Sequence, residues 1–162
     1  MTAGQSTAFT RRRWLECRVP PPLVVAVMAA GMWGVARLMR GDWPVWTAQA
    51  GLALGLSGVL VAGWAVMSFR LASTTIHPLR PSEASALVVA GPNRWSRNPM
   101  YVGMLMALTG WGLWIGGGLA LSGVAGAWAW LHWLQVLPEE RAMTARFGAE
   151  YADYCARVRR WV

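Results

Sequence analysis

The chain has 162 residues, of which 56% are hydrophobic and 14% are charged, whereas a soluble domain carries about 25% charged residues. All of its basic residues are Arg, and the net charge is +8. A basic chain can indicate nucleic-acid binding, but these Arg residues flank apolar runs, so attraction to anionic lipid headgroups explains them better. The composition therefore favours a protein of the lipid bilayer and excludes a nucleic-acid partner.

The other compositional features agree with a membrane protein. The 12 Trp and 18 Gly are typical of one, because Trp gathers at interfaces and Gly is frequent in transmembrane helices. The two cysteines, Cys17 and Cys155, lie far apart, and there is no CxxC or HxxxH spacing, so we expect neither a disulfide framework nor a metal site.

Four apolar segments follow along the chain. The first two cover about residues 22–39 and 47–69. The third and fourth share residues 99–137, and the run from Ile115 to Gly118 is the expected turn between two halves of about 17–20 residues, near the lower limit for crossing a bilayer. The basic N-terminus precedes the first segment, and no clear small-x-small cleavage site accompanies it, so we expect a retained first helix. These patterns predict an all-α integral membrane protein with about four transmembrane helices in one domain, residues 1–162, with two N-terminal spans in 1–69 and the candidate catalytic part in 70–162.

The Arg residues predict the orientation of these spans. Only Arg37 and Arg40 lie at the end of the first segment that leads to the second, while the others flank the opposite ends of the spans, as the positive-inside rule requires of cytoplasmic segments. We therefore expect both termini and the loop of residues 70–98 in the cytoplasm. The absence of Lys, with abundant Arg and Ala, suggests a bacterial inner membrane.

Small residues in the second segment predict close helix packing. Gly51 and Gly55 form a Gly-xxx-Gly pattern, which allows two helix backbones to approach closely. The pattern fits packing within the chain, and it also fits a homodimer through the same face.

The tail after Glu140 has the pattern of a surface helix. Its apolar residues recur every three or four positions, as on one face of a helix: Met143, Phe147, Tyr151, Tyr154, Val158 and Trp161. Arg residues occupy other faces, so we expect a C-terminal amphipathic helix at the membrane interface, which can also act as a lid over a site.

Two polar segments flank the third and fourth spans. Asn98 and Pro99 suit the N-cap and first turn of a helix, and free N–H groups beside Arg94 and Arg97 suit a carboxylate or phosphate. A capped helix with an interfacial Arg explains the same residues without a ligand.

At the other end of the hairpin, Glu139 and Glu140 follow Pro138. They fit the first turn of a separate tail helix, or a site in which one carboxylate faces a cationic or hydroxyl-rich ligand. His132 lies inside the fourth span, where it fits either a functional group or a helix–helix hydrogen bond. His77 lies in a polar loop, where a structural role is the simpler interpretation.

Taken together, these segments resemble a known family. Thr74 to Pro78, Gly91 to Gly103, Pro138 to Arg141 and Phe147 to Tyr154, in this order around a helical hairpin, resemble the isoprenylcysteine carboxyl methyltransferases and the related phospholipid methyltransferases. The resemblance covers about residues 70–161. Asn98 stands where the family pattern, Arg-His-Pro-x-Tyr-x-Gly, has His.

The resemblance implies an integral membrane methyltransferase that uses S-adenosylmethionine at the cytoplasmic face and takes a small or lipid-like acceptor from the bilayer. It implies that Arg97 and Glu140 are catalytic. It implies a cofactor site that includes His77, Leu87, Gly91, Arg94, Arg97, Asn98, Tyr101, Gly103, Glu139, Glu140 and Tyr151. A carboxylate or thiolate acceptor needs no base, whereas a neutral amine must lose a proton, with which a Glu or His77 can help.

Two other functions fit the same pattern. A sterol-type reductase with a nicotinamide cofactor has a similar hairpin, but the two glutamates would repel the phosphate of that cofactor. A non-enzymatic membrane module predicts that Arg97, Glu139 and Glu140 tolerate neutral substitution.

Overall fold

Helices dominate the described part of the chain, in which no strand occurs. The computed structural model describes residues 16–39, 43–71 and 87–162. The long helices are α2 (Pro21–Leu38), α3 (Val45–Leu71), α4 (Pro99–Trp114), α5 (Ser122–Trp130) and α6 (Leu137–Arg157). Shorter elements are η2 (Gly91–Arg94), η3 (Leu119–Leu121) and the π-helix η4 (Leu131–Val136). The all-α prediction is confirmed for these residues.

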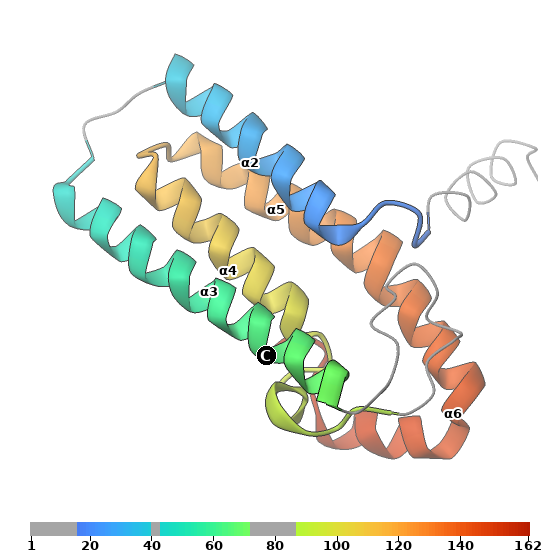
Figure 1. Cartoon of the computed structure of the whole chain (residues 1–162). Helices are drawn as coiled ribbons and strands as arrows, with labels where there is room; N and C mark the ends of the chain where they lie inside the picture. The colour runs from blue at the N-terminus through green and yellow to red at the C-terminus, as the bar shows by residue number, and fades with distance from the viewer. Residues whose placement is uncertain (1–15, 40–42, 72–86) are drawn as a thin grey trace, which may run out of the picture.

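Four helices run side by side in one bundle. Figure 1 shows α4 between α3 and α5, with α2 along α5, and these are also the pairs in contact. The predicted turn after the third segment is confirmed, because α4 ends at Trp114 and the chain reverses through a Gly-rich turn and η3 before α5 begins. The core between α2, α4 and α5 is built from Met32, Ala36, Leu108, Ala120 and Ala127.

Glycines allow α3 and α4 to touch through their backbones. A Cβ atom placed on Gly58 would lie 2.5 Å from the backbone of Gly103 and of Ala107, and one on Gly51 would lie 2.6 Å from the carbonyl oxygen of Gly110. No side chain fits in such a contact, so Gly51 and Gly58 serve packing within the chain. Association of two copies through Gly51 and Gly55 stays a prediction.

A continuous helical run carries the chain from the fourth segment into the tail. The elements α5, η4 and α6 follow one another without a break at Glu139 and Glu140. The two acids therefore lie in the first turn of α6, as one interpretation expected, but α6 continues directly from η4 and is not a separate helix.

The same run then bends at Gly148. Its φ of 52° and ψ of −119° are accessible to glycine but not to residues with a Cβ, and Figure 1 shows α6 turning back at its lower end. The predicted single apolar face of the tail is thus broken at Gly148, and Val158 and Trp161 lie beyond the end of α6. Tyr151 and Tyr154 are still buried, because the bend brings them back onto the bundle.

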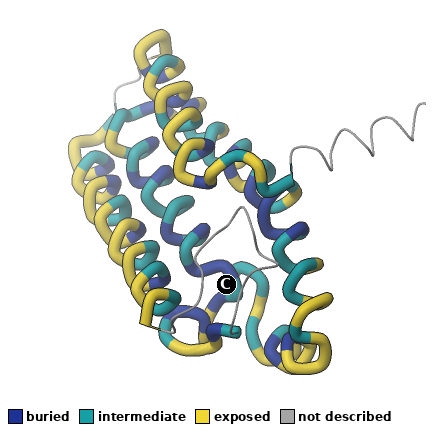
Figure 2. The backbone as a smooth tube through the Cα atoms, turned by 45° about the vertical axis from the view of Figure 1, so that its right-hand side comes forward, coloured by how far each residue is buried: buried dark blue, intermediate teal, exposed yellow. Residues whose placement is uncertain are grey.

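Two helices are long and apolar enough to cross a membrane, namely α2 and α3. Only 22% and 11% of their apolar stretches are buried, and the outer face of α3 is exposed along its length (Figure 2). An exposed face of this kind, including Leu52, Leu56, Val59 and Leu60, suits contact with lipid. α4 has 16 residues and α5 has nine, so the third and fourth spans stay predictions.

Candidate functional site

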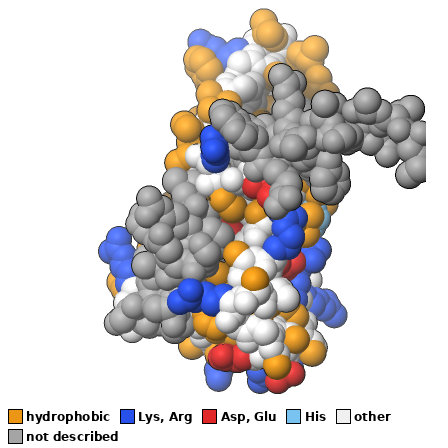
Figure 3. Space-filling view, turned by 90° about the vertical axis from the view of Figure 1, so that its right-hand side faces the viewer, with side chains coloured by type: hydrophobic (Ala, Val, Ile, Leu, Met, Phe, Trp, Pro, Cys, Tyr) orange, Lys and Arg blue, Asp and Glu red, His pale blue; other side chains and the backbone are white. Residues whose placement is uncertain are grey.

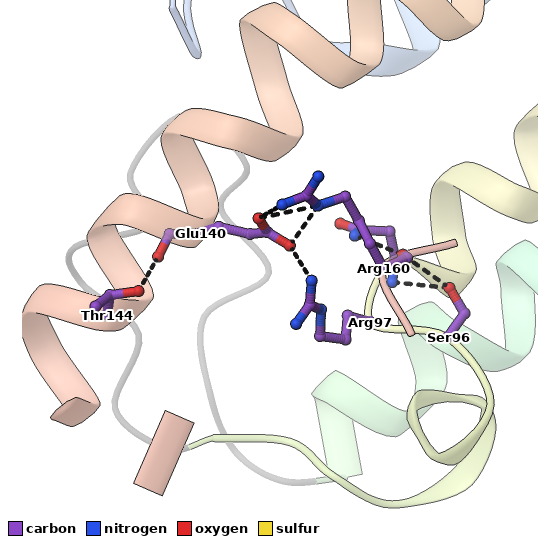
Figure 4. Close-up of polar contacts among 6 residues, drawn as sticks. Ser96, Arg97, Glu140, Thr144 and Arg160 are labelled. Carbon is purple, nitrogen blue, oxygen red and sulfur yellow. Dashed lines mark hydrogen bonds and ion pairs between the residues drawn. The ribbon is translucent and has the colours of Figure 1, made fainter. Parts of the chain in front are cut away.

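The site is centred on Glu140, which lies between two arginines (Figure 4). Arg97 Nη2 donates a hydrogen bond of 2.8 Å to Glu140 Oε1. Arg160 is bound to both carboxylate oxygens, with Nη2 at 2.7 Å from Oε2 and Nε at 3.0 Å from each oxygen. These three residues, the Glu140 cluster below, come from the loop before α4, from α6 and from the end of the chain.

Backbone contacts hold the two arginines in place. The Arg97 N–H donates to the carbonyl of Arg159 at 2.9 Å, and the Asn98 side-chain amide donates to the carbonyl of Arg160 at 3.0 Å. Ser96 Oγ lies 3.4 Å from that same carbonyl. These hydrogen bonds join the loop of residues 96–98 to the C-terminal segment of residues 159–161, in addition to the contacts that both arginines make with Glu140.

Asn98 has a different role from the one expected. It occupies the N-cap position of α4, with Pro99 in the first turn, but its side chain makes no capping hydrogen bond. Its amide is used to hold the Arg160 carbonyl. The predicted cap is therefore wrong for the side chain, and Asn98 fixes the C-terminal segment.

Glu139 is adjacent to Glu140 in sequence but has separate partners. Tyr101 Oη and Gln135 Nε2 each donate to Glu139 Oε1 at 2.6 Å. Burial raises the pKa of Glu139 to about 7, and the hydrogen bonds from Tyr101 and Gln135 oppose that rise. The two glutamates therefore have different surroundings: Glu140 pairs with two arginines, and Glu139 accepts hydrogen bonds from neutral side chains.

Tyr151 and Tyr154 are buried side chains in the part of α6 beyond the bend. Tyr154 Oη donates to the carbonyl of Asn93 at 2.7 Å, which ties α6 to η2. Burial raises the pKa of Tyr151, the Glu140 charge raises it further, and the Arg97 charge lowers it. Tyr151 thus lies within the field of the Glu140 cluster, and its contact with a cofactor stays a prediction.

The Glu140 cluster has an excess of positive charge and an unused donor. Two guanidinium groups share one carboxylate, whose hydrogen bonds raise the pKa of Arg160. The Arg97 side chain is 11% exposed, and its Nε is buried without a hydrogen-bond partner. A buried donor without a partner is costly, so the arrangement suits an incoming anionic oxygen.

The structure brings together Arg97, Asn98, Tyr101, Glu139, Glu140 and Tyr151 of the predicted site. Gly103 does not belong to this group, because α3 fills the space where its Cβ would lie, with Gly58 O at 2.5 Å and Ala62 N at 2.6 Å. Gly103 therefore packs against α3, and its predicted cofactor contact stays a prediction.

The remaining predicted residues lie at the edge of the site or beyond the described part of the chain. Gly91 lies against Ser68 and Trp64 of α3, Arg94 is exposed at the end of η2, and Leu87 is half-buried. His77 lies outside the described residues.

Sequence reasoning missed two members of the site, Arg160 and Gln135. Gln135 had a usable signal, since it is a polar residue in an apolar span, one turn before Glu139. Arg160 had none, because it is one of several Arg residues in the tail and reaches Glu140 only through the bend at Gly148.

Figure 3 shows that most charged side chains on the face it presents lie in its lower half.

Comparisons with known proteins identify a family for most of the chain. A family model described as phospholipid methyltransferase matches residues 46–150, which include α3, α4 and both glutamates, whereas Arg160 lies beyond the match. An uncharacterized protein of Haemophilus influenzae is 38% identical over 63 residues, which are 39% of this chain and 100% of that protein. No solved structure matches the chain significantly.

Proposed function

The chain belongs to the phospholipid methyltransferase family, and on that premise we propose that it transfers a methyl group from S-adenosylmethionine to a lipid-like acceptor at a membrane surface. The observation that carries the proposal is the Glu140 cluster, a positively charged group with a buried unused donor, at the point where three distant segments meet.

The residues present fit the charged end of S-adenosylmethionine. The molecule carries an α-carboxylate, an α-ammonium, a sulfonium, a ribose diol and an adenine. Arg97 Nε is a buried donor without a partner and suits the α-carboxylate. Glu140 holds Arg97 in the required orientation and offers a negative charge to the α-ammonium. Tyr151, in the part of α6 beyond the bend, offers an aromatic surface.

The chemistry needs little from the protein beyond positioning. When bound, S-adenosylmethionine supplies its methyl group: the bond from carbon to sulfur breaks, its electron pair stays on sulfur, and the acceptor atom bonds to the carbon. Holding two reactants in line and excluding water can provide most of the rate. Asn98 contributes through the C-terminal segment, whose Arg160 carbonyl it binds.

The exposed apolar helices fit a membrane location. α2 and α3 span the bilayer in this proposal, and the hairpin of α4 and α5 provides two further spans. The positive-inside rule then places Arg97, Arg160 and the site at the cytoplasmic face of a bacterial inner membrane. A lipid acceptor would reach the site from the bilayer.

A transfer assay tests the function directly. Purified protein is incubated with tritium-labelled S-adenosylmethionine and vesicles of phosphatidylethanolamine, whose amine can accept methyl groups, or of phosphatidylglycerol, which has none. We expect label in the extracted phosphatidylethanolamine, and about 100-fold less with Arg97→Ala, because a lost hydrogen bond to a charged group costs about 1.5–3 kcal/mol. Absence of label from every lipid with the wild type would contradict the proposal.

A further inference from the structure

An aromatic cluster on α5 and η4 adjoins the Glu140 cluster. The His132 ring stacks on Trp128 with centroids 5.1 Å apart and planes at 7°. Trp161 lies 6.2 Å from the rings of both Trp128 and His132, and Trp133 lies 5.8 Å from His132. Since Trp161 follows Arg160 directly, the C-terminal segment reaches both clusters with consecutive side chains.

Two polar atoms of this cluster are buried without a hydrogen-bond partner, namely His132 Nδ1 and Trp161 Nε1. Both belong to groups that normally find a partner when buried. An imidazole nitrogen can accept or donate a hydrogen bond, while an indole nitrogen only donates. The helix–helix hydrogen bond that was one interpretation of His132 is not made by Nδ1. The pair instead suits a ligand that brings both an N–H donor and an oxygen acceptor.

In the proposed topology, His132 lies on the membrane side of the Glu140 cluster. It lies eight residues before Glu140 on one continuous helical run, which is about two turns away along the helix. Trp128 and Trp133 are 39% and 44% exposed, so the aromatic cluster opens to the outer surface of the hairpin. The π-helix in which His132 lies is a distortion often found at functional sites.

The other bases near the site are already engaged. Glu140 is shared by two arginines, and Glu139 Oε1 accepts hydrogen bonds from Tyr101 and Gln135. His132 is the one imidazole among the described residues. The charged groups that act on it are Arg160 and Glu140, and the other groups around it are the three indole rings.

From these observations we propose that His132 and Trp161 bind the reacting end of the methyl acceptor, an amine-bearing phospholipid headgroup, and that His132 Nδ1 takes the proton of its ammonium. The inference rests on the proposed function. The N–H bond of the ammonium breaks, its electron pair stays on nitrogen as the nucleophile, and the proton passes to the imidazole and later to solvent. Trp161 Nε1 donates to an oxygen of the headgroup phosphate. The faces of Trp128 and Trp161 hold the ammonium by cation–π attraction before it reacts.

Variant kinetics test the two residues separately. With phosphatidylethanolamine vesicles at pH 7, we expect His132→Gln to lower kcat about 100-fold, the usual scale for a lost general base. Its rate should rise with pH as the free amine deprotonates. Trp161→Phe keeps a ring and removes the donor, so KM should rise about tenfold with little change in kcat. Trp114→Phe, at the far end of α4, is the matched control and should change neither value.

Two further measurements separate function from folding. Binding of S-adenosylhomocysteine should be unchanged in His132→Gln and Trp161→Phe, because neither touches the Arg97 side chain. The chain has two histidines, so NMR of histidine-labelled protein in phosphatidylglycerol nanodiscs shows two sets of imidazole signals, which His77→Asn assigns. Adding phosphatidylethanolamine should shift the His132 signals, whereas phosphatidylcholine, whose nitrogen has no proton, should shift them much less.

The outcomes distinguish this inference from the function on which it rests. If the wild type labels phosphatidylethanolamine but His132→Gln does so at the same rate and with the same pH dependence, the inference is wrong and the function stands. An equal NMR response to both lipids also overturns it. If the wild type labels no lipid, both proposals fall.

Discussion

The contact between α3 and α4 and the cluster around Glu140 are held by opposite kinds of interaction. At the helix contact the backbone of α3 at Gly51 and Gly58 lies against the backbone of α4 at Gly110 and Gly103, without a charged group. At the cluster, three charged side chains from segments far apart in sequence are joined by hydrogen bonds of 2.7–3.0 Å. The contact between α3 and α4 fixes the relative positions of these two helices. The Glu140 cluster then joins charged side chains from segments that the bundle brings close together.

The difference determines what each region tolerates. Close backbone packing depends on side-chain volume, so even one added methylene group destabilises the contact. The stability of a partly buried ion cluster depends on the pairing of opposite charges, and loss of one member leaves the others without their partner. Substitutions that change side-chain volume without changing charge, and substitutions that remove a charge, therefore distinguish the two regions.

The largest effect is expected at the helix contact. Gly58→Leu forces α3 and α4 apart, because its Cβ alone would lie 2.5 Å from backbone atoms, and should destabilise the protein by about 3 kcal/mol or more. The measurement is thermal unfolding in detergent. The matched control is Gly63→Leu in the same helix, where nothing lies within 4 Å of the added Cβ. Equal stability of the two variants would show that α3 does not pack on α4 in this way.

The next effect concerns Glu139 and pH. Burial raises its pKa from 4.5 to about 7, so the folded state binds its proton more tightly than the unfolded state does. The stability that this adds is fully present below pH 4.5 and is lost as pH rises through 7, about 3 kcal/mol in all. Glu139→Gln should abolish this part of the pH dependence and make the protein more stable than wild type above pH 7. The exposed Glu150→Gln is the control, and an unchanged slope in Glu139→Gln would contradict the assignment.

A smaller effect is expected where the C-terminal segment meets the cluster. Arg160→Gln removes the contact with both oxygens of Glu140, and the Arg160 side chain is 37% exposed, so solvent limits the loss to about 1 kcal/mol. The backbone N–H of Arg97, which donates to Arg159 O, should then exchange with deuterium roughly five times faster. Arg159→Gln changes an exposed neighbour and should leave that exchange unaltered. The same acceleration in both variants would mean that Arg160 does not hold the segment.

The smallest effect is expected for Tyr154→Phe. It removes the 2.7 Å hydrogen bond to the carbonyl of Asn93 and keeps the buried ring, so about 1 kcal/mol of stability should be lost. In a chain of this size that is roughly 2–4 °C in melting temperature. A drop above about 10 °C would show that the hydroxyl supports more than the tie between α6 and η2.

The helices were predictable because long apolar runs without charged residues mark them in the sequence. The expected segments 22–39 and 47–69 correspond to α2 and α3 within two residues, and 99–137 contains α4, α5 and η4. The turn at Ile115 to Gly118 was also predictable, since three successive glycines interrupt an apolar run. The glycine pattern of α3 indicated close packing, although not which helix would be the partner.

The polar site was only partly predictable. Arg97, Glu139 and Glu140 stand out in sequence because they flank a long uncharged stretch. Arg160 could not be identified, because its place depends on the backbone at Gly148, where the pattern continued as one helical face. Asn98 was misjudged because a capping position is visible in sequence, whereas the carbonyl that its amide binds comes from 62 residues further on.

The central claim is that the Glu140 cluster binds the methyl donor, and calorimetric titration of S-adenosylhomocysteine into the purified protein tests it most directly. We expect saturable binding to the wild type, about 10- to 100-fold weaker binding to Arg97→Ala, and unchanged binding to Arg37→Ala, an exposed arginine at the end of α2. Equal affinity of wild type and Arg97→Ala, or no binding to the wild type, would contradict it.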